Sequence, residues 1–428
     1  MSVPHFLNRK SNVQYRCGVF WLTVRIGGWP YIMNAEIHIT PASFVSAPYV
    51  KCPRCRENSF GILSIDGRWY SRRCRSCYYP SGTDDAATFP LPEISKKVIY
   101  LDQFCISEMM KTLNTAFDRD RRARVLPKWR EVFEHLDTVC KLQLAVCPAS
   151  SFHFSESSVA ECRSALTRMY EYFSGECHFR GIDYIKLAQI HKHAENWMHR
   201  RENAVELDRD DAIRGKVDVW QDRFSVHIEP FKVTEMIDDT RRARDAAHAG
   251  IAGAFRAWQT EKSKKFHDWY RDELRGYAPC VVRQHVRDTL EAAATLGRVA
   301  DAAERNEGRI PPESFGLSEA KSLLLTYSSK FMIVLQRLFG DHESDSARTV
   351  ATLREYIANA DFEPVHHVRI SSLLFAALAR RAAAGQKRPP NRGMLNDIEM
   401  VSVLLPYCDA MFVDREIHSL LSERDVRA

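Results

Sequence analysis

Short apolar runs that end in an acid mark both ends of the main part of this chain. Residues 98–101 (VIYL) run into Asp102, and residues 410–413 (AMFV) run into Asp414. Runs of four or five mostly β-prone residues with a polar break are typical of buried strands in a parallel sheet. Because ligands collect at the carboxyl ends of such strands, we expect both carboxylates to face one functional crevice.

The apolar pattern between these runs predicts the other core elements. Helices are expected at 103–110 and 128–140, a strand at 142–147, and a helix that has Glu156 in its first turn and continues to residue 173. Near the C-terminus a helix starts at 396–400, stops at 406–408, and is followed by Asp409 and the last strand. From about 174 to 365, apolar residues recur every three or four positions, which predicts a helical insertion.

Two cysteine pairs precede this core. Cys52 and Cys55 form one C-x-x-C pair, Cys74 and Cys77 form another, and the turn signal at 66–67 (DG) between them predicts a hairpin. This spacing is typical of a tetrahedral zinc site in a zinc ribbon. Since four cysteines leave no position open for substrate, the zinc is expected to be structural. Four unrelated thiols, or a redox pair, are the alternative.

These elements predict four segments and an α/β fold class. A β-rich segment occupies residues 1–47, where aromatic and β-branched residues at 13–40 predict two or three strands. The zinc ribbon follows at 48–80, and a linker rich in Pro, Ser and Asp follows at 81–95. The main α/β domain, with a parallel sheet and the helical insertion, spans 96–428.

Length and composition narrow the class of protein. The 428 residues exceed what one core usually fills, and a hydrophobic content of 45% predicts a packed protein. Neither a stretch long enough to span a membrane nor a secretion signal is evident, so we expect a cytoplasmic protein without a membrane partner. Twelve cysteines in such a chain favour metal binding and buried thiols over disulfides.

The net charge of +6 is modest, so the distribution of charge is more informative than its total. Arg72, Arg73 and Arg75 make the ribbon basic, and aromatic residues accompany them. Such a surface suits contact with RNA, and protein docking is the alternative. The chain contains no P-loop, dinucleotide-binding fingerprint or serine-hydrolase elbow, which argues against those classes.

Carboxylates at the predicted strand and helix ends point to a divalent cation. Asp102, Glu156, Asp397 and Asp414 would repel one another unless one or two Mg²⁺ or Mn²⁺ ions neutralised them. Capping is the alternative for Asp102 and Asp397, and a favourable helix dipole is the alternative for Glu156. Asp409 is equally well explained as a turn residue.

Three stretches together resemble PIN-like domain ribonucleases. They are VIYLDQFCIS around Asp102, SFHFSE from 151 to 156, and NDIEMVSVLLPYCDAMFVDRE from 396 to 416. The resemblance implies an α/β sandwich whose acids bind Mg²⁺ or Mn²⁺ at the carboxyl end of a parallel sheet. By motif position, the first to fourth acids are Asp102, Glu156, Asp397 and Asp414. His153 and Asp409 match a histidine and a further acid of one PIN-like subgroup, and we expect His153 to have a supporting role.

The function implied by this resemblance is metal-dependent cleavage of RNA by an endonuclease, in a toxin-like or defence setting. Two alternatives differ in class or target. One is a PIN-like module with weak catalysis that binds RNA or protein, and the other is a DNA-directed nuclease of the same chemistry. A protein partner or an oligomer is compatible with each.

Overall fold

A computed structural model of the protein describes residues 45–66, 69–80, 89–90, 94–113, 126–157, 162–175, 177–201, 204–215, 217–219, 234–306, 326–340 and 346–427. The strands expected at 13–40 lie outside this range. The chain divides into two compact units. The first comprises residues 1–94 and 218–222, and the second comprises residues 95–217 and 223–428.

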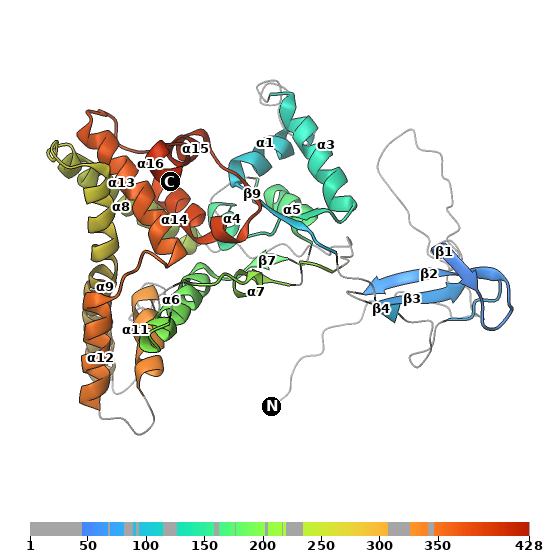
Figure 1. Ribbon diagram of the computed structural model, residues 1–428, viewed down its shortest axis with the longest axis horizontal. Helices are drawn as coiled ribbons and strands as arrows, with labels where there is room; N and C mark the ends of the chain where they lie inside the picture. Colours follow the sequence, from blue (N-terminus) through green and yellow to red (C-terminus); the bar gives the residue numbers. More distant parts are fainter. Residues whose placement is uncertain are drawn as a thin grey trace. The chain divides into compact units, whose positions relative to one another are not determined.

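The first unit contains a four-stranded antiparallel sheet in the order β1-β2-β3-β4 (Figure 1). Its strands are β1 (Ser46–Lys51), β2 (Asn58–Asp66), β3 (Trp69–Cys74) and β4 (Phe89–Pro90). β2 and β3 form the expected hairpin, in which Phe60 lies opposite Cys74. β4 pairs with β3 although it lies within the stretch expected to be a linker, so part of that stretch is sheet.

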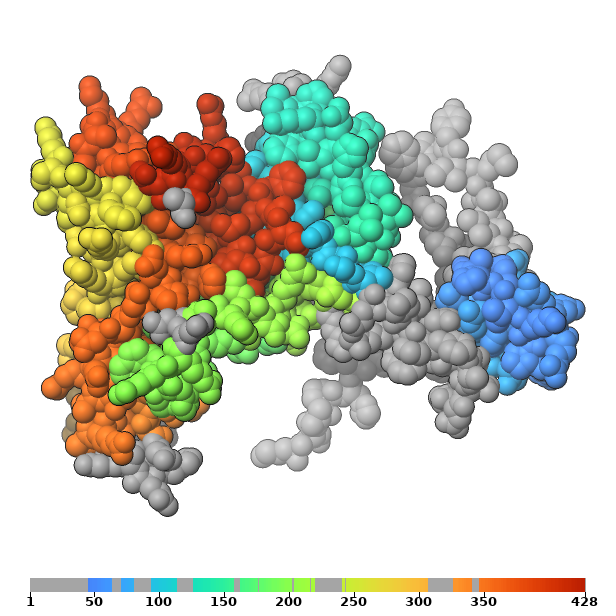
Figure 2. All heavy atoms as spheres, in the orientation of Figure 1, coloured from blue at the N-terminus to red at the C-terminus, as the bar shows by residue number. Residues whose placement is uncertain are grey.

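The second unit contains a short parallel sheet in the order β6-β5-β9. The central strand β5 (Lys97–Leu101) lies between β6 (Ala145–Val146) and β9 (Ala410–Phe412). Both pairings are parallel. Figure 2 shows the cyan segment around β5 directly against the red C-terminal segment. The expected parallel sheet is therefore present, and the protein is mixed α/β.

Helices cover both faces of this sheet because the side chains of β5 alternate between two apolar clusters. Val98 and Tyr100 are buried with residues of α13 (His366–Ala383) and α14 (Met394–Leu404). Leu101 is buried with α1 (Gln103–Leu113), α3 (Lys128–Lys141) and α5 (Arg163–Ser174). Each such side chain stabilises the fold by about 1.5–3 kcal/mol, so the central strand is firmly held.

A third apolar cluster joins the helices of the expected insertion. Trp269, Phe331 and Tyr356 are buried there, among α6 (Ile182–Met198), α9 (Phe266–Arg305), α11 (Tyr327–Phe339) and α12 (Ser346–Asn359). Helix α13 contributes Leu374 to the sheet cluster and Ala376 to this one. The helical part therefore packs onto the sheet domain through a shared helix.

Smaller elements complete the second unit. They are α4 (Ser151–Ser157), β7 (His178–Phe179), α7 (Arg209–Ala212), β8 (Ile213–Arg214), α8 (Thr234–Trp258), the 3-10 helix η3 (Leu405–Tyr407), α15 (Arg415–Leu421) and α16 (Arg424–Arg427). The helix expected from Glu156 to 173 is in fact two helices, and Glu156 lies in the last turn of α4. Among the described helices, none has both the length and the apolar character needed to cross a membrane.

Candidate metal centres

The four cysteines of the ribbon converge on one point. Cys52, Cys55, Cys74 and Cys77 have sulfur atoms that all lie within 4.8 Å of one another. The Cys52–Cys77 and Cys55–Cys74 sulfur pairs are each 3.6 Å apart. Zinc–sulfur bonds of about 2.3 Å in a tetrahedron place sulfurs roughly 3.8 Å apart, so the cluster can hold a metal such as zinc.

Matching backbone turns present the two cysteine pairs. Arg56 and Tyr78, each directly after the second cysteine of its pair, have positive φ angles of 67° and 58°. The Arg56 N–H donates to the Cys52 carbonyl at 2.9 Å, and the Tyr78 N–H donates to the Cys74 carbonyl at 3.1 Å. Because non-glycine residues adopt this left-handed conformation at a cost, two such turns indicate a geometry imposed by the site.

Local hydrogen bonds favour the thiolate of Cys74. Burial alone raises the pKa of this thiol, but the Ser59 hydroxyl and the backbone N–H groups of Cys77 and Ser76 lower it, with a net value of about 6. The Ser59 oxygen is 3.1 Å from the sulfur, and the Cys77 nitrogen is 3.3 Å from it. Since thiolates bind metals and thiols do not, this environment suits a metal ligand.

The three ribbon arginines have different surroundings. Arg72 is only 6% exposed, and its Nη1 donates to the carbonyls of Pro48 (3.0 Å) and Phe60 (2.9 Å). This placement argues against the expected RNA contact for Arg72, because its guanidinium joins strands inside the ribbon. Arg73 and Arg75 lie nearer the surface, where Arg75 donates to the Tyr49 hydroxyl at 3.0 Å.

Asp102 and Asp414 lie at the same edge of the parallel sheet. β5 and β9 are paired, and the Asp102 N–H donates to the Phe412 carbonyl at 3.1 Å. One carboxylate oxygen of Asp102 accepts the Gln103 N–H at 2.6 Å. Asp414 is the N-cap of α15, where one oxygen accepts the Ile417 N–H at 2.8 Å. Capping and metal binding are compatible, because each carboxylate has a second oxygen.

Glu156 and Asp397 approach the same edge from helices. Glu156 lies on α4, which follows β6, and Asp397 lies in the first turn of α14. The alternative that Asp397 caps its helix does not hold, because the N-cap of α14 is Gly393. Charges on Asp102, Asp414 and Glu156 all act on Asp397. The structure therefore brings all four expected acids into one electrostatic cluster.

Burial and mutual repulsion disturb the ionisation of this cluster. Burial, followed by the charges of its neighbours, raises the pKa of Asp397 to about 8. Burial and the charge of Asp102 raise the pKa of Glu156 to about 7, against an opposing effect of Arg244. Burial, and to a lesser extent the charge of Asp414, raises the pKa of Asp102 to about 6. Paired carboxyl groups with pKa values this high are typical of functional sites.

The carboxylates are more loosely spaced than the cysteines. Among the residues that the structure describes, only the cysteine set has three or more metal-ligating side chains within 4.8 Å of one another. The chemistry of the acids nevertheless fits Mg²⁺ or Mn²⁺, which take oxygen ligands and retain several water molecules. Water-mediated contacts do not require the carboxylates to touch one another.

Asn391 lies beside the carboxylate cluster and was not among the residues expected there. Its side-chain nitrogen donates to Glu416 at 2.7 Å, and its side-chain oxygen accepts the Gly393 N–H at 2.7 Å. A Cβ on Gly393 would lie 3.4 Å from an oxygen of Asp397, so this turn lies close to the acid. The Asn-x-Gly turn ahead of a helix was the signal that could have identified it.

Asp409 lies at the opposite end of the sheet from the other acids. One oxygen accepts the Val98 N–H at 2.8 Å and is 2.8 Å from Arg209, and the other is 3.0 Å from Lys97. Although partial burial opposes them, these contacts lower the pKa of Asp409. Because Asp409 precedes its strand while Asp414 follows it, Asp409 does not lie with the other acids as a further ligand. Its contacts join the start of β9 to β5, which is a supporting role.

His153 is buried between two aromatic rings. Its ring stacks on Tyr100 and Tyr170 with centroid distances of 4.9 and 4.3 Å. Nδ1 accepts the Ser150 N–H at 3.1 Å, which leaves Nε2 to donate to the Leu101 carbonyl at 2.7 Å. Burial lowers the pKa of His153 to about 4. This neutral histidine therefore holds the end of β5 just before Asp102.

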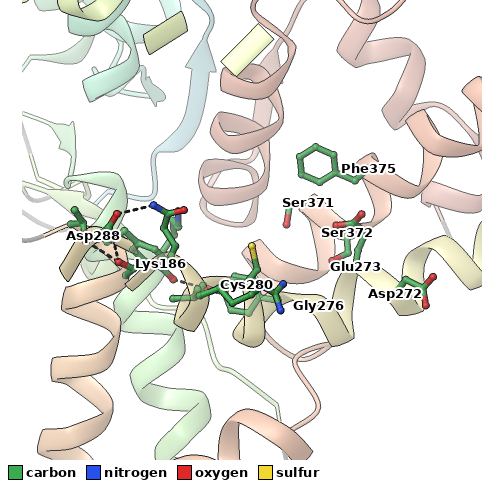
Figure 3. A pocket seen from close by; sticks show the side chains of 16 residues that line it. Lys186, Asp272, Glu273, Gly276, Cys280, Asp288, Ser371, Ser372 and Phe375 are labelled. Atoms are coloured by element: carbon green, nitrogen blue, oxygen red, sulfur yellow. Dashed lines mark hydrogen bonds between the residues drawn. The ribbon is translucent and has the colours of Figure 1, made fainter. Parts of the chain in front are cut away.

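A separate hollow of about 760 Å³ lies in the helical part (Figure 3). Lys186 lines it, forms a 2.9 Å ion pair with Glu399, and lies 4.0 Å from the centroid of the Tyr327 ring. Burial raises the pKa of Glu273, another lining residue. None of the four acids is among the described residues that line this hollow, so it is distinct from the carboxylate cluster.

No protein-family model matches the chain, and neither a curated protein nor a solved structure is a match for it.

Proposed function

We propose that this protein is a metal-dependent endonuclease that hydrolyses RNA phosphodiester bonds. The proposal is carried by the cluster of Asp102, Glu156, Asp397 and Asp414 at the carboxyl edge of a parallel sheet. Burial and mutual repulsion of four carboxylates in one cluster lower the stability of the fold, and a bound divalent cation would offset that cost. The parallel sheet with helices on both faces, and the positions of the four acids on it, support a PIN-like nuclease.

The side chains have distinct roles in this proposal. Asp102 and Asp414 each commit one oxygen to a backbone N–H, which fixes the carboxylate and orients its second oxygen for a metal. The pKa of Asp397 is raised to about 8, so a cation that bound there near neutral pH would displace a proton from this carboxyl. A bound Mg²⁺ or Mn²⁺ ion would activate water and stabilise charge on the phosphate.

The ribbon serves this activity by holding a structural zinc ion and offering an RNA-binding surface. Four cysteines would close the coordination sphere, so the metal would contribute folding energy to the ribbon, whose described residues form only a very small apolar core. The guanidinium of Arg75 lies 5.5 Å from the centroid of the Tyr49 ring, and that of Arg73 lies 5.9 Å from the Tyr78 ring. Arginine and tyrosine in contact suit phosphates and stacked bases.

Cleavage of matched oligonucleotides tests the proposal. The full chain with Mn²⁺ is expected to cut single-stranded RNA faster than DNA of the same sequence, and the double variant Asp102→Asn, Asp397→Asn should lose at least about 10²-fold in rate. Glu399→Gln is the matched control, because Glu399 lies on the same helix as Asp397 and pairs with Lys186. Equal cutting by the wild type and the double variant would refute the assignment, and preference for DNA would change the substrate.

A further inference from the structure

Helix α8, from the helical part, carries an arginine to the carboxylate cluster. α8 packs against α13 and α14 (Figure 1). The side chain of Arg392, in the loop before α14, pairs with Asp245 and donates to the Arg241 carbonyl at 3.4 Å. Arg241 and Asp245 lie on either side of Arg244 in the sequence of α8. Their contacts with Arg392 therefore keep this turn of α8 beside the start of α14, the helix that bears Asp397.

The guanidinium of Arg244 has an unused edge. Its Nε and Nη2 atoms are buried, and neither has a hydrogen-bond acceptor among the residues that the structure describes. These two nitrogens form one side of the planar group, the side that binds two oxygens of a carboxylate or phosphate at once. A buried charged donor without an acceptor is costly, so this edge is suited to an anion that binds from outside the chain.

The charge of Arg244 acts on the cluster without being neutralised by it. Burial and Asp102 raise the pKa of Glu156, and the Arg244 guanidinium acts in the opposite direction. Glu156 is therefore within electrostatic reach, yet it accepts no hydrogen bond from the two buried nitrogens. A cation that acts on Glu156 without bonding to it, on a turn tied to the loop before Asp397, is arranged to meet a ligand that also meets the acids.

We propose that Arg244 is a catalytic residue that binds the phosphate of the substrate through Nε and Nη2. The inference rests on the proposed nuclease function and adds that the helical part supplies the positive charge. A phosphodiester has two non-bridging oxygens and can meet a metal on the carboxylates and the arginine together. Because negative charge on the phosphate oxygens grows during attack by water, a fixed guanidinium stabilises the transition state.

Binding of a mononucleotide tests this site without requiring cleavage. In calorimetric titrations with Mg²⁺, adenosine 5′-monophosphate should bind the full chain and adenosine should not, because only the first carries a phosphate. Arg244→Gln should weaken binding of the monophosphate about 10- to 100-fold. Arg244→Lys keeps the charge but loses the two-point contact, so its affinity for the monophosphate should lie between those of the wild type and Arg244→Gln. Arg256→Gln, an exposed arginine on the same helix, should bind like wild type.

Kinetics separate a role in catalysis from a role in folding. Arg244→Gln should lower kcat for RNA cleavage about 10²- to 10³-fold. Its affinity for Mn²⁺ should stay the same or rise, because a positive charge near the carboxylates has been removed. Parallel loss of Mn²⁺ binding and activity would indicate a structural role and overturn the proposal.

The two proposals can fail separately. If Arg244→Gln cleaves RNA and binds the monophosphate as the wild type does, the inference about Arg244 is wrong and the nuclease stands. Failure of the wild type to bind the monophosphate, or equal binding of adenosine, also overturns the inference. If the monophosphate binds through Arg244 but no nucleic acid is cut, the phosphate site stands and the nuclease proposal is wrong.

Discussion

Asp397 is the acid of the cluster whose negative charge is most disfavoured by its surroundings. It lies in the first turn of α14, where the helix dipole favours a negative charge. Burial and the surrounding acids nevertheless raise its pKa to about 8. An unpaired buried carboxylate destabilises the fold, so the position is best explained by a ligand that compensates for the charge.

The raised pKa of Asp397 predicts a pH dependence for the metal-free protein. A carboxyl with a raised pKa in the folded state stabilises the fold when protonated, and that stability is lost as pH rises through the folded pKa. We therefore expect Asp397→Asn to melt a few degrees above the wild type at pH 9 without added divalent cations, and to show little gain at pH 4. Thermal unfolding followed by circular dichroism measures the difference.

Magnesium provides the control for this prediction. Saturating Mg²⁺ should stabilise the wild type at pH 9 and leave Asp397→Asn largely unaffected, since binding stabilises only the state that holds the ligand. A wild type that is already as stable as the variant at pH 9 without metal would show that the carboxylates do not repel one another.

The location of a site residue could be predicted from the sequence where the residue directly precedes or follows a strand. Asp102 and Asp414 follow strands, so their shared edge follows from parallel pairing. Asp409 lies away from this edge because it precedes its strand. At roughly 3.3 Å per residue, positions 409 and 414 lie on the order of 16 Å apart along the chain. Arg244 could not be predicted, because only the packing of α8 against α14 brings it near the acids.

The ribbon is the element whose local sequence most directly sets its structure. Two C-x-x-C pairs and a hairpin are close in sequence, so the cysteines meet without help from distant contacts. Strand β6 is shorter than the sequence predicted. Six residues at 142–147 have strand character, but Gln143 has a positive φ of 59° and only Ala145–Val146 pairs with β5. The turn after α3 limits the length of β6, and the apolar pattern does not reveal that turn.

We predict that the loss of one cysteine unfolds the ribbon and spares the second unit. Cys74→Ser should reduce bound zinc from about one ion per chain to near zero, because structural zinc contributes on the order of 10–16 kcal/mol of binding energy. Metal analysis and limited proteolysis measure the effect, and cleavage should begin within residues 45–80. The second unit should resist, because it has its own apolar clusters.

An exposed cysteine provides the control for the ribbon. Cys280→Ser, on α9, should keep the zinc and the wild-type proteolysis pattern. A Cys74→Ser protein that retains zinc and an intact ribbon would rule out the four-cysteine metal site.

At the scale of the whole molecule, one sheet joins segments from both ends of the second unit. β5 and β9 pair although residues 102–409 separate them. The helices between them fold around their own apolar cluster and return to the sheet through α13. The apolar periodicity predicted that these residues are helical. It could not predict which helix faces the acids, because that depends on packing between helices far apart in sequence.

Titration with Mn²⁺ tests the central claim, that the four carboxylates form one divalent metal site. Calorimetry on the full chain with its ribbon zinc intact should show saturable Mn²⁺ binding to the wild type and to Glu399→Gln. Binding should be lost in the double variant Asp102→Asn, Asp397→Asn, which keeps the size of both side chains but removes two of the four carboxylates. Mn²⁺ binding of equal affinity in the wild type and the double variant would contradict the account.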